Sequence, residues 1–107
     1  MSAHSDTLIS SALRAALQSW LEAQSALKGL SDNTLSAYHT DVVGFMAFMT
    51  LHSGARSGLA ALARISVSDM RAWMASQRAQ QIAPRSLARK LSAVKNFYVW
   101  LAAREGF

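Results

Sequence analysis

Residues 84–106 read PRSLARKLSAVKNFYVWLAAREG, and this stretch decides the fold class. Large apolar residues recur in it at steps of three and four, the period of a helix with one buried face. They are Leu87, Leu91, Val94, Tyr98 and Leu101. Pro84 suits a first turn, where its missing N–H costs nothing, and Gly106 suits a C-terminal stop. The spacing predicts a helix over residues 84–105 that packs one side into a core.

The other side of this predicted helix is polar and basic. At about 100° per residue, one line of side chains opposes the core stripe. It consists of Arg85, Arg89, Ser92 and Asn96, flanked by Ser86, Lys90 and Lys95. Such groups contact phosphates and base edges in the DNA major groove, which admits an α-helix. Two interpretations stay open here: a DNA-binding face and a solvated surface. Trp100 continues the line and either covers a neighbouring surface or packs.

Three more segments have helical periodicity, at about 6–27, 32–52 and 67–81. Their expected end signals are Ser5 or Asp6 and Gly29 for the first, Ser31 for the second, and Ser66 with Asp69 for the third. The expected buried stripe of the second is Leu35, Tyr38, Val42, Phe45, Met49 and His52, opposite Ser36, Thr40, Gly44 and Ala47. Residues 53–64 contain two glycines and predict a loop with one short helical turn. The sequence therefore predicts one all-α domain over residues 1–107, a compact bundle of four main helices.

The 107-residue chain has a formal net charge of +5, which is unevenly distributed. Residues 1–54 hold two basic and four acidic residues, whereas residues 55–107 hold nine basic and two acidic residues. A basic half favours a polyanionic partner, although solubility alone explains it equally well. The hydrophobic fraction of 51% excludes a disordered chain, and the absence of cysteine fits a reducing cytoplasm.

The sequence lacks the signatures of several other classes. It contains neither an apolar run of about 18 residues nor an N-terminal secretion signal. Its carboxylates show no paired spacing, its three histidines are scattered, and it has no glycine-rich phosphate loop. We therefore expect no catalytic residue, no metal and no cofactor in this chain. Neither a membrane nor a small-molecule substrate is an expected partner.

Two stretches resemble the tyrosine recombinases of the phage-integrase family. Residues 30–38, LSDNTLSAY, followed by Asp41 and Phe45, resemble the LS-x-NT-L-x-AY-x-x-D opening of that family. Residues 84–98, PRSLARKLSAVKNFY, followed by Trp100-Leu101 and residues 104–106, resemble its RS-x-AR-x-LSA-x-R-x-FY segment. The two motifs occur in order, about 50 residues apart, and the resemblance is closest to the XerC/XerD branch.

The resemblance implies an N-terminal core-binding domain, a SAM-like helical bundle that clamps duplex DNA at the recombination site. Its second and fourth main helices would approach the major groove. Carried over by position, the DNA-binding residues would be Asn33, Thr34, Ser36, His39 and Thr40, together with Arg85, Ser86, Arg89, Lys90, Ser92, Lys95 and Asn96. His39-Thr40 stands where relatives often carry Arg, and Lys95 replaces a common Arg, which removes a bidentate fork.

The resemblance also implies what this chain lacks. The catalytic arginine, lysine, histidine and tyrosine of the family lie in a separate C-terminal domain, so we expect a fragment of a longer recombinase. Its partners would be double-stranded DNA and, in the full-length protein, other recombinase protomers in a tetramer on DNA. Chromosome-dimer resolution is the expected process, with plasmids and integrating elements as alternatives. A helical protein-interaction module and a stand-alone DNA-binding protein also remain open.

Overall fold

The computed structural model describes residues 10–53 and 59–105. Five helices lie in these residues, four of them long, in the order α2 (Ser11–Lys28), α3 (Asp32–Ser53), α4 (Leu59–Ala63), α5 (Val67–Ala79) and α6 (Pro84–Glu105). Within this part of the chain there is no strand, so the expected all-α fold with four main helices is confirmed. None of the helices described here has both the length and the apolar character that a membrane span requires.

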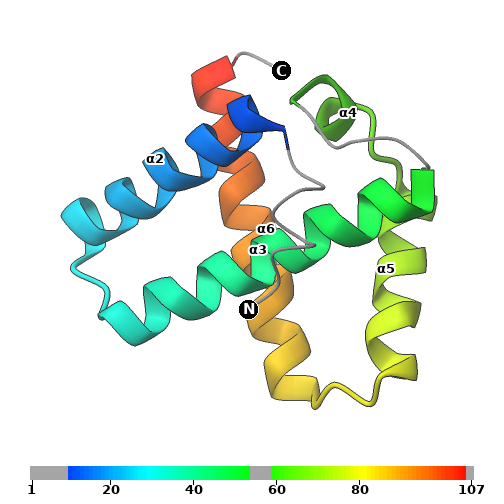
Figure 1. Cartoon of the computed structure of the whole chain (residues 1–107). Helices are drawn as coiled ribbons and strands as arrows, with labels where there is room; N and C mark the ends of the chain where they lie inside the picture. Colours follow the sequence, from blue (N-terminus) through cyan, green and yellow to red (C-terminus); the bar gives the residue numbers. More distant parts are fainter. Residues whose placement is uncertain (1–9, 54–58, 106–107) are drawn as a thin grey trace.

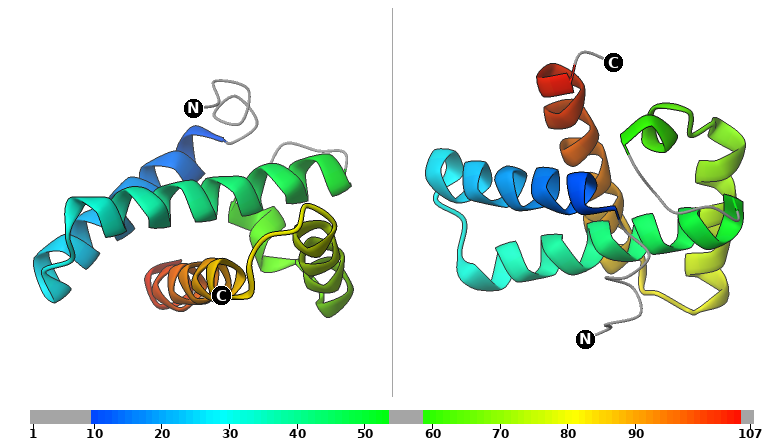
Figure 2. Two further views of the ribbon diagram at one scale, coloured as in Figure 1. Left: turned by 90° about the horizontal axis from the view of Figure 1, so that it is seen from below. Right: turned by 45° about the horizontal axis from the view of Figure 1, so that its top comes forward.

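Helix α3 is the centre of the bundle. It contacts α2, α5 and α6, and α2 also contacts α6. Figure 1 shows α2 and α3 as two arms joined by a short connection, with α6 crossing behind α3 and α5 beside its C-terminal half. In the left view of Figure 2, α3 lies across the page while α6 runs nearly toward the viewer, so the two helices cross steeply. A helix with neighbours on several sides buries more than one stripe of residues.

The core contains two groups of packed aromatic rings, each with one ring from α3 and one from α6. Trp20 of α2 stacks on Tyr38 at 5.7 Å between ring centroids and meets the edge of Phe97 at 5.3 Å. In the other group, Phe45 of α3 meets Trp73 at 5.1 Å and Tyr98 at 6.2 Å, both edge to face. Edge-to-face and offset arrangements suit the ring quadrupoles.

Local sequence signals explain where most helices begin and end. The Ser31 hydroxyl accepts from the Thr34 N–H at 3.2 Å and caps α3, as predicted. Before α5, Ser66 and Asp69 form the reciprocal capping box, also as predicted. Gly29 ends α2 with a left-handed φ of 62°, and α6 has the predicted bounds.

Two predicted boundaries are wrong. Helix α2 begins at Ser11 and not near residue 6, because Ser10 is extended and its hydroxyl accepts from the Leu13 N–H at 3.2 Å; the expected caps Ser5 and Asp6 lie outside the described residues. Helix α5 ends at Ala79 rather than Gln81, because Gln81 adopts a left-handed φ of 60°. Ile82 N–H then reaches back to the Gln77 carbonyl, which closes the last turn.

Two predictions about the faces of α3 are also wrong. His52, expected on the buried stripe, has 40% of its side chain exposed and lies 3.2 Å from Asp69 at the start of α5. Ala47, expected on the outer small-residue face, is buried. The burial of Ala47 follows from the central position of α3, since α5 also packs against this helix, whereas His52 lies near the C-terminal end of α3 and pairs with Asp69. The predicted helical turn between the second and third main helices is α4, while Gly106 lies outside the described residues.

Candidate nucleic-acid interface

The basic face predicted for α6 is a real surface of the folded chain. Arg85, Ser92, Lys95 and Asn96 are all exposed, and Ser86 beside them is half-buried. The opposite side of the same helix is core, with Ala93, Val94, Phe97 and Leu101 buried. Over the described residues, the side chains of Arg85, Ser92, Lys95 and Asn96 have no partner within the chain. Their charges and hydrogen-bonding groups are therefore available to an external ligand.

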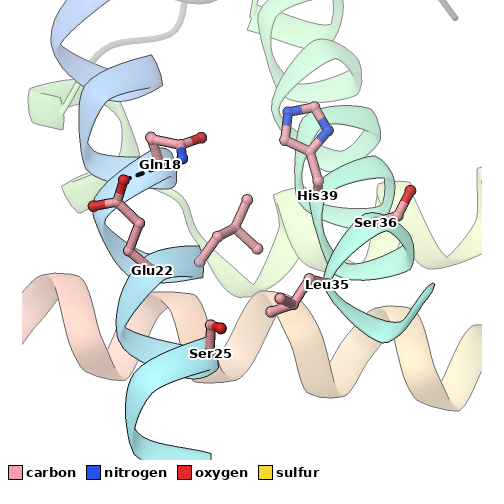
Figure 3. Close-up of a pocket in the computed structure, with 7 residues that line it drawn as sticks. Gln18, Glu22, Ser25, Leu35, Ser36 and His39 are labelled. Atoms are coloured by element: carbon pink, nitrogen blue, oxygen red, sulfur yellow. Dashed lines mark hydrogen bonds between the residues drawn. The ribbon is translucent and has the colours of Figure 1, made fainter. Parts of the chain in front are cut away.

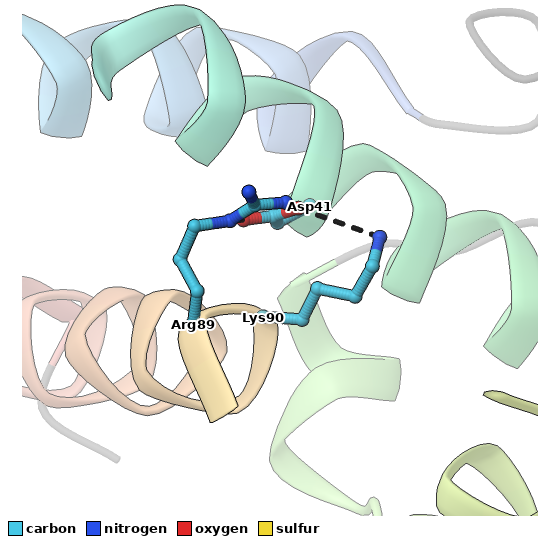
Figure 4. A network of polar contacts seen from close by, with 3 residues as sticks. All are labelled: Asp41, Arg89 and Lys90. Atoms are coloured by element: carbon cyan, nitrogen blue, oxygen red, sulfur yellow. Dashed lines mark hydrogen bonds and ion pairs between the residues drawn. The ribbon is translucent and has the colours of Figure 1, made fainter. Parts of the chain in front are cut away.

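Arg89, the central residue of that face, is held differently. Its Nε donates to Oδ2 of Asp41 at 2.9 Å and its Nη2 donates to Oδ1 at 2.9 Å, a bidentate pair between α6 and α3. Lys90 Nζ approaches the same Oδ1 at 3.4 Å. Figure 4 shows the two cations reaching from α6 to one carboxylate on α3. Two of the cations expected on the DNA-facing side are therefore also internal contacts of the bundle.

The three members of this cluster differ in their access to water. The Asp41 side chain is fully buried, Lys90 is 20% exposed, and Arg89 is 45% exposed. The hydrogen bond to Asp41 raises the pKa of Arg89 above its ordinary value. A carboxylate cannot stay ionised in a protein interior without such partners, because desolvation of the charge is costly. The cluster carries one negative and two positive charges, so one positive charge remains on the surface.

Asp41 is the residue that the sequence analysis missed. It is a position of the first family motif, but the sequence predicts neither its burial nor its partner. A signal was present, because Asp41 lies three residues after Tyr38 and four before Phe45, on the apolar stripe of α3. A charged residue on a buried stripe requires a charged partner. The identity of that partner, 48 residues further along the chain, is not visible in the periodicity.

The five candidate residues on α3 do not form one group with α6. Asn33, Ser36, His39 and Thr40 are exposed, while Thr34 is half-buried and its hydroxyl lies 3.0 Å from that of the capping Ser31. Ser36 and His39 border a hollow between α2 and α3, opposite Gln18 and Glu22 (Figure 3). Thr40 borders another hollow, between α3 and α5, which Lys90 also lines. The structure thus brings Thr40 next to the α6 cluster and places Ser36 and His39 toward α2.

At the far end of α6, Trp100 packs within the chain. Its ring is stacked on Phe97, with centroids 6.2 Å apart, and the Arg104 guanidinium lies 5.1 Å from its centre. The packing interpretation of Trp100 is therefore the one that its contacts support. Arg104 is the last cation of the helix, and this contact sets it apart from the exposed residues at 85–96.

A search of the described residues finds no group of three His, Cys, Asp or Glu side chains that could hold a metal ion. Tyr38 and Tyr98, the two tyrosines predicted on buried stripes, both make internal contacts. Tyr38 stacks on Trp20, and the Tyr98 hydroxyl donates to the Leu62 carbonyl at 3.0 Å. Burial raises the pKa of the Tyr98 hydroxyl well above its ordinary value, so the group stays protonated. The exposed functional groups described above are therefore cations, hydroxyl groups and an amide on α6.

Comparisons with known proteins agree with this geometry. The chain matches the family described as "Phage integrase, N-terminal SAM-like domain" over residues 8–105. It is 34% identical to tyrosine recombinase XerC of Brucella suis over 92 residues, which are 86% of this chain and 29% of that protein. It is 40% identical to tyrosine recombinase XerC of Bradyrhizobium diazoefficiens over 87 residues, which are 81% of this chain and 27% of that protein.

A third relative, tyrosine recombinase XerC of Rhodospirillum centenum, is 36% identical over 87 residues, covering 81% of this chain and 24% of that protein. The chain thus spans less than a third of the length of each of these relatives. No solved structure gives a significant match. The family match covers nearly all of the chain, and the all-α bundle is the fold that its description names. The chain therefore belongs to the phage-integrase family, as an N-terminal SAM-like domain.

Proposed function

We propose that this chain is the core-binding domain of a Xer-type tyrosine recombinase and grips duplex DNA at the recombination site. The observation that carries the proposal is a set of exposed residues, Arg85, Ser92, Lys95 and Asn96, which have no partner among the described residues and lie on a helix whose other side is core. Cations on such a face neutralise phosphates, while hydroxyl and amide groups reach base edges. The family match and the three XerC relatives support DNA as the ligand.

The rest of the proposal extends the family resemblance of the sequence, and this chain spans less than a third of its XerC relatives. The parent protein would be a tyrosine recombinase that cleaves and rejoins DNA strands with a catalytic domain outside these residues. It would act in the cytoplasm as one protomer of a tetramer on DNA, with chromosome-dimer resolution as its process. Full-length protein that fails to form a covalent complex with a nicked recombination site would contradict this assignment.

Exposed cations predict how the affinity depends on salt. Arg85 and Lys95 each contribute one free charge, and the Asp41, Arg89 and Lys90 cluster contributes a net charge of one. With about three phosphates neutralised by α6, log K should fall with log[salt] at a slope of about −3. Fluorescence anisotropy with a labelled random-sequence duplex of about 30 base pairs measures this slope, and a flat response would exclude DNA as the ligand.

The sharpest single variant is Arg85→Gln, because Arg85 is exposed and has no partner in the part of the chain that the structure describes. We expect its Kd for duplex DNA to rise about five- to tenfold and its salt slope to become shallower by about 0.9. Arg71→Gln is the matched control, since Arg71 is an exposed cation on α5 outside the candidate set. Equal losses in the two variants would indicate that net charge alone, and not the α6 face, attracts DNA. Arg89→Glu is less suitable because it would place a second carboxylate beside the buried Asp41.

A further inference from the structure

The carboxylate of Asp41 is fully buried between α3 and α6, although apolar packing alone could hold these two helices together. Its side chain has no exposed surface, and both of its oxygens accept from cations of α6. The same crossing of α3 and α6 already buries Val42, Phe45, Val94 and Phe97. Because a buried ion pair roughly balances its own desolvation cost, an apolar residue here would stabilise the bundle about as well. The geometry of the pair therefore suggests a role beyond adhesion.

What Asp41 does determine is the position of the Arg89 guanidinium. Two of the three guanidinium nitrogens, Nε and Nη2, donate to Asp41, and Nη1 makes no bond to it. The side chain remains 45% exposed, and helical spacing places Arg89 on the same side of α6 as Arg85 and Ser92. An arginine held in this way loses less side-chain entropy on binding than a free one. Lys90, at 20% exposure, is drawn to the same carboxylate.

We propose that Asp41 is a positioning residue for DNA binding: it orients Arg89 toward the duplex and cancels one of the two charges that Arg89 and Lys90 bring to the surface. This inference rests on the proposed function and specifies how its central cation works. Arg89 would act as a pre-oriented donor to the DNA backbone rather than as a mobile charge. Arg85 and Lys95, which have no such anchor, would act as ordinary screened cations.

A double-mutant cycle in DNA affinity tests the proposal, with Asp41→Asn, Arg89→Gln and the variant that combines them. All Kd values are taken at a temperature where circular dichroism shows each protein folded, so lost stability does not enter. We expect each single variant to weaken binding about tenfold, and Arg89→Gln to cost less than about twofold once Asp41 is Asn. Losses that simply multiply in the double variant would overturn the proposal.

Glu22→Gln provides the matched control for charge. Glu22 is exposed on α2, and its carboxylate accepts a hydrogen bond from the Gln18 side chain. Its replacement by Gln raises the net charge by one, as Asp41→Asn does. A general charge effect would make both variants bind DNA more tightly, with steeper salt slopes. We expect tighter DNA binding and a steeper salt slope only for Glu22→Gln. Asp41→Asn binding as tightly as Glu22→Gln would overturn the proposal.

Arg89→Lys covers the outcome in which Asp41→Asn does not fold. Lysine keeps the charge at a half-exposed position but lacks the fork, so the fold should persist and the salt slope should stay the same. We expect a Kd about five- to tenfold higher, and an unchanged Kd would overturn the proposal. Failure of the wild-type chain to bind duplex DNA would instead refute the proposed function. Normal wild-type binding with no effect of these variants would refute only the role of Asp41.

Discussion

His52, near the C-terminal end of α3, lies 3.2 Å from the carboxylate of Asp69 in the first turn of α5. The same carboxylate accepts from the Ser66 backbone N–H at 2.9 Å, so one side chain both caps α5 and contacts α3. The bond from the Ser66 N–H is the main reason that the pKa of Asp69 lies below its ordinary value, and the Ser66 hydroxyl and His52 lower it further.

This pKa predicts how acid affects the domain. Because the folded-state pKa is lower than the unfolded one, the ionised form stabilises the fold above the ordinary pKa. That contribution disappears as the pH falls through the folded value. We expect Asp69→Asn to melt below wild type near neutral pH, and the difference in melting temperature to shrink as the pH falls below the ordinary pKa of an aspartate and through the lowered pKa of Asp69. Melting followed by circular dichroism checks this, with Glu22→Gln as a control whose gap should stay small. A pH-independent gap for Asp69→Asn would contradict the prediction.

The buried cluster predicts an unequal cost for losing each partner. Arg89→Met leaves the fully buried Asp41 with only Lys90 at 3.4 Å, so the unfolding free energy should drop by about 3 kcal/mol. Asp41→Asn leaves an amide of the same shape, while the 45%-exposed Arg89 regains water, and about 1–2 kcal/mol is expected. Urea unfolding measures both values. A larger loss of unfolding free energy in Asp41→Asn than in Arg89→Met would show that an unpaired Asp41 carboxylate is not the more destabilising of the two.

Two glycines predict effects of opposite sign. Gly29 has a φ of 62°, which an L side chain rarely adopts, so Gly29→Ala should destabilise by about 1 kcal/mol despite open space around its Cβ position. Gly44 lies inside α3 and also has no atom within 4 Å of that position. Gly44→Ala should stabilise the domain by about 0.5–1 kcal/mol through helix propensity. Thermal melts of the two variants would have to shift in opposite directions.

Lys95 and Asn96 are adjacent on α6, but their replacement should affect DNA binding in different ways, one through affinity and the other through sequence preference. Lys95 is an exposed ammonium, so Lys95→Gln should weaken binding to all duplexes alike and make the salt slope shallower by about 0.9. Asn96 presents an amide, the group that pairs with adenine, so Asn96→Ala should relax the preference at one position by about 1–3 kcal/mol. Selection from a random duplex library with each variant separates the two effects. A uniform loss for Asn96→Ala would assign Asn96 to the backbone.

Much of the fold was predictable because it depends on neighbouring residues. The capping signals at Ser31, at Ser66 with Asp69 and at Pro84 each act within one helical turn, and the structure confirms all three. The exposed residues of α6 were predictable for the same reason. Helical spacing alone predicts that Asn96 faces solvent while its neighbour Phe97 faces the core. The predicted start of the first helix near residue 6 was wrong, because Ser10 also has capping chemistry and periodicity alone does not select the residue that caps the helix.

The sequence by itself determined four main helices, most of their ends and a basic polar line on the last of them. Only the tertiary structure decided which cations on that line are free, which face of α3 is covered at Ala47, and that His52 meets Asp69 rather than the core. The physical reason is distance along the chain. Periodicity reports on side chains within a few turns, whereas the partner of Asp41 lies 48 residues away and is set by how α6 crosses α3.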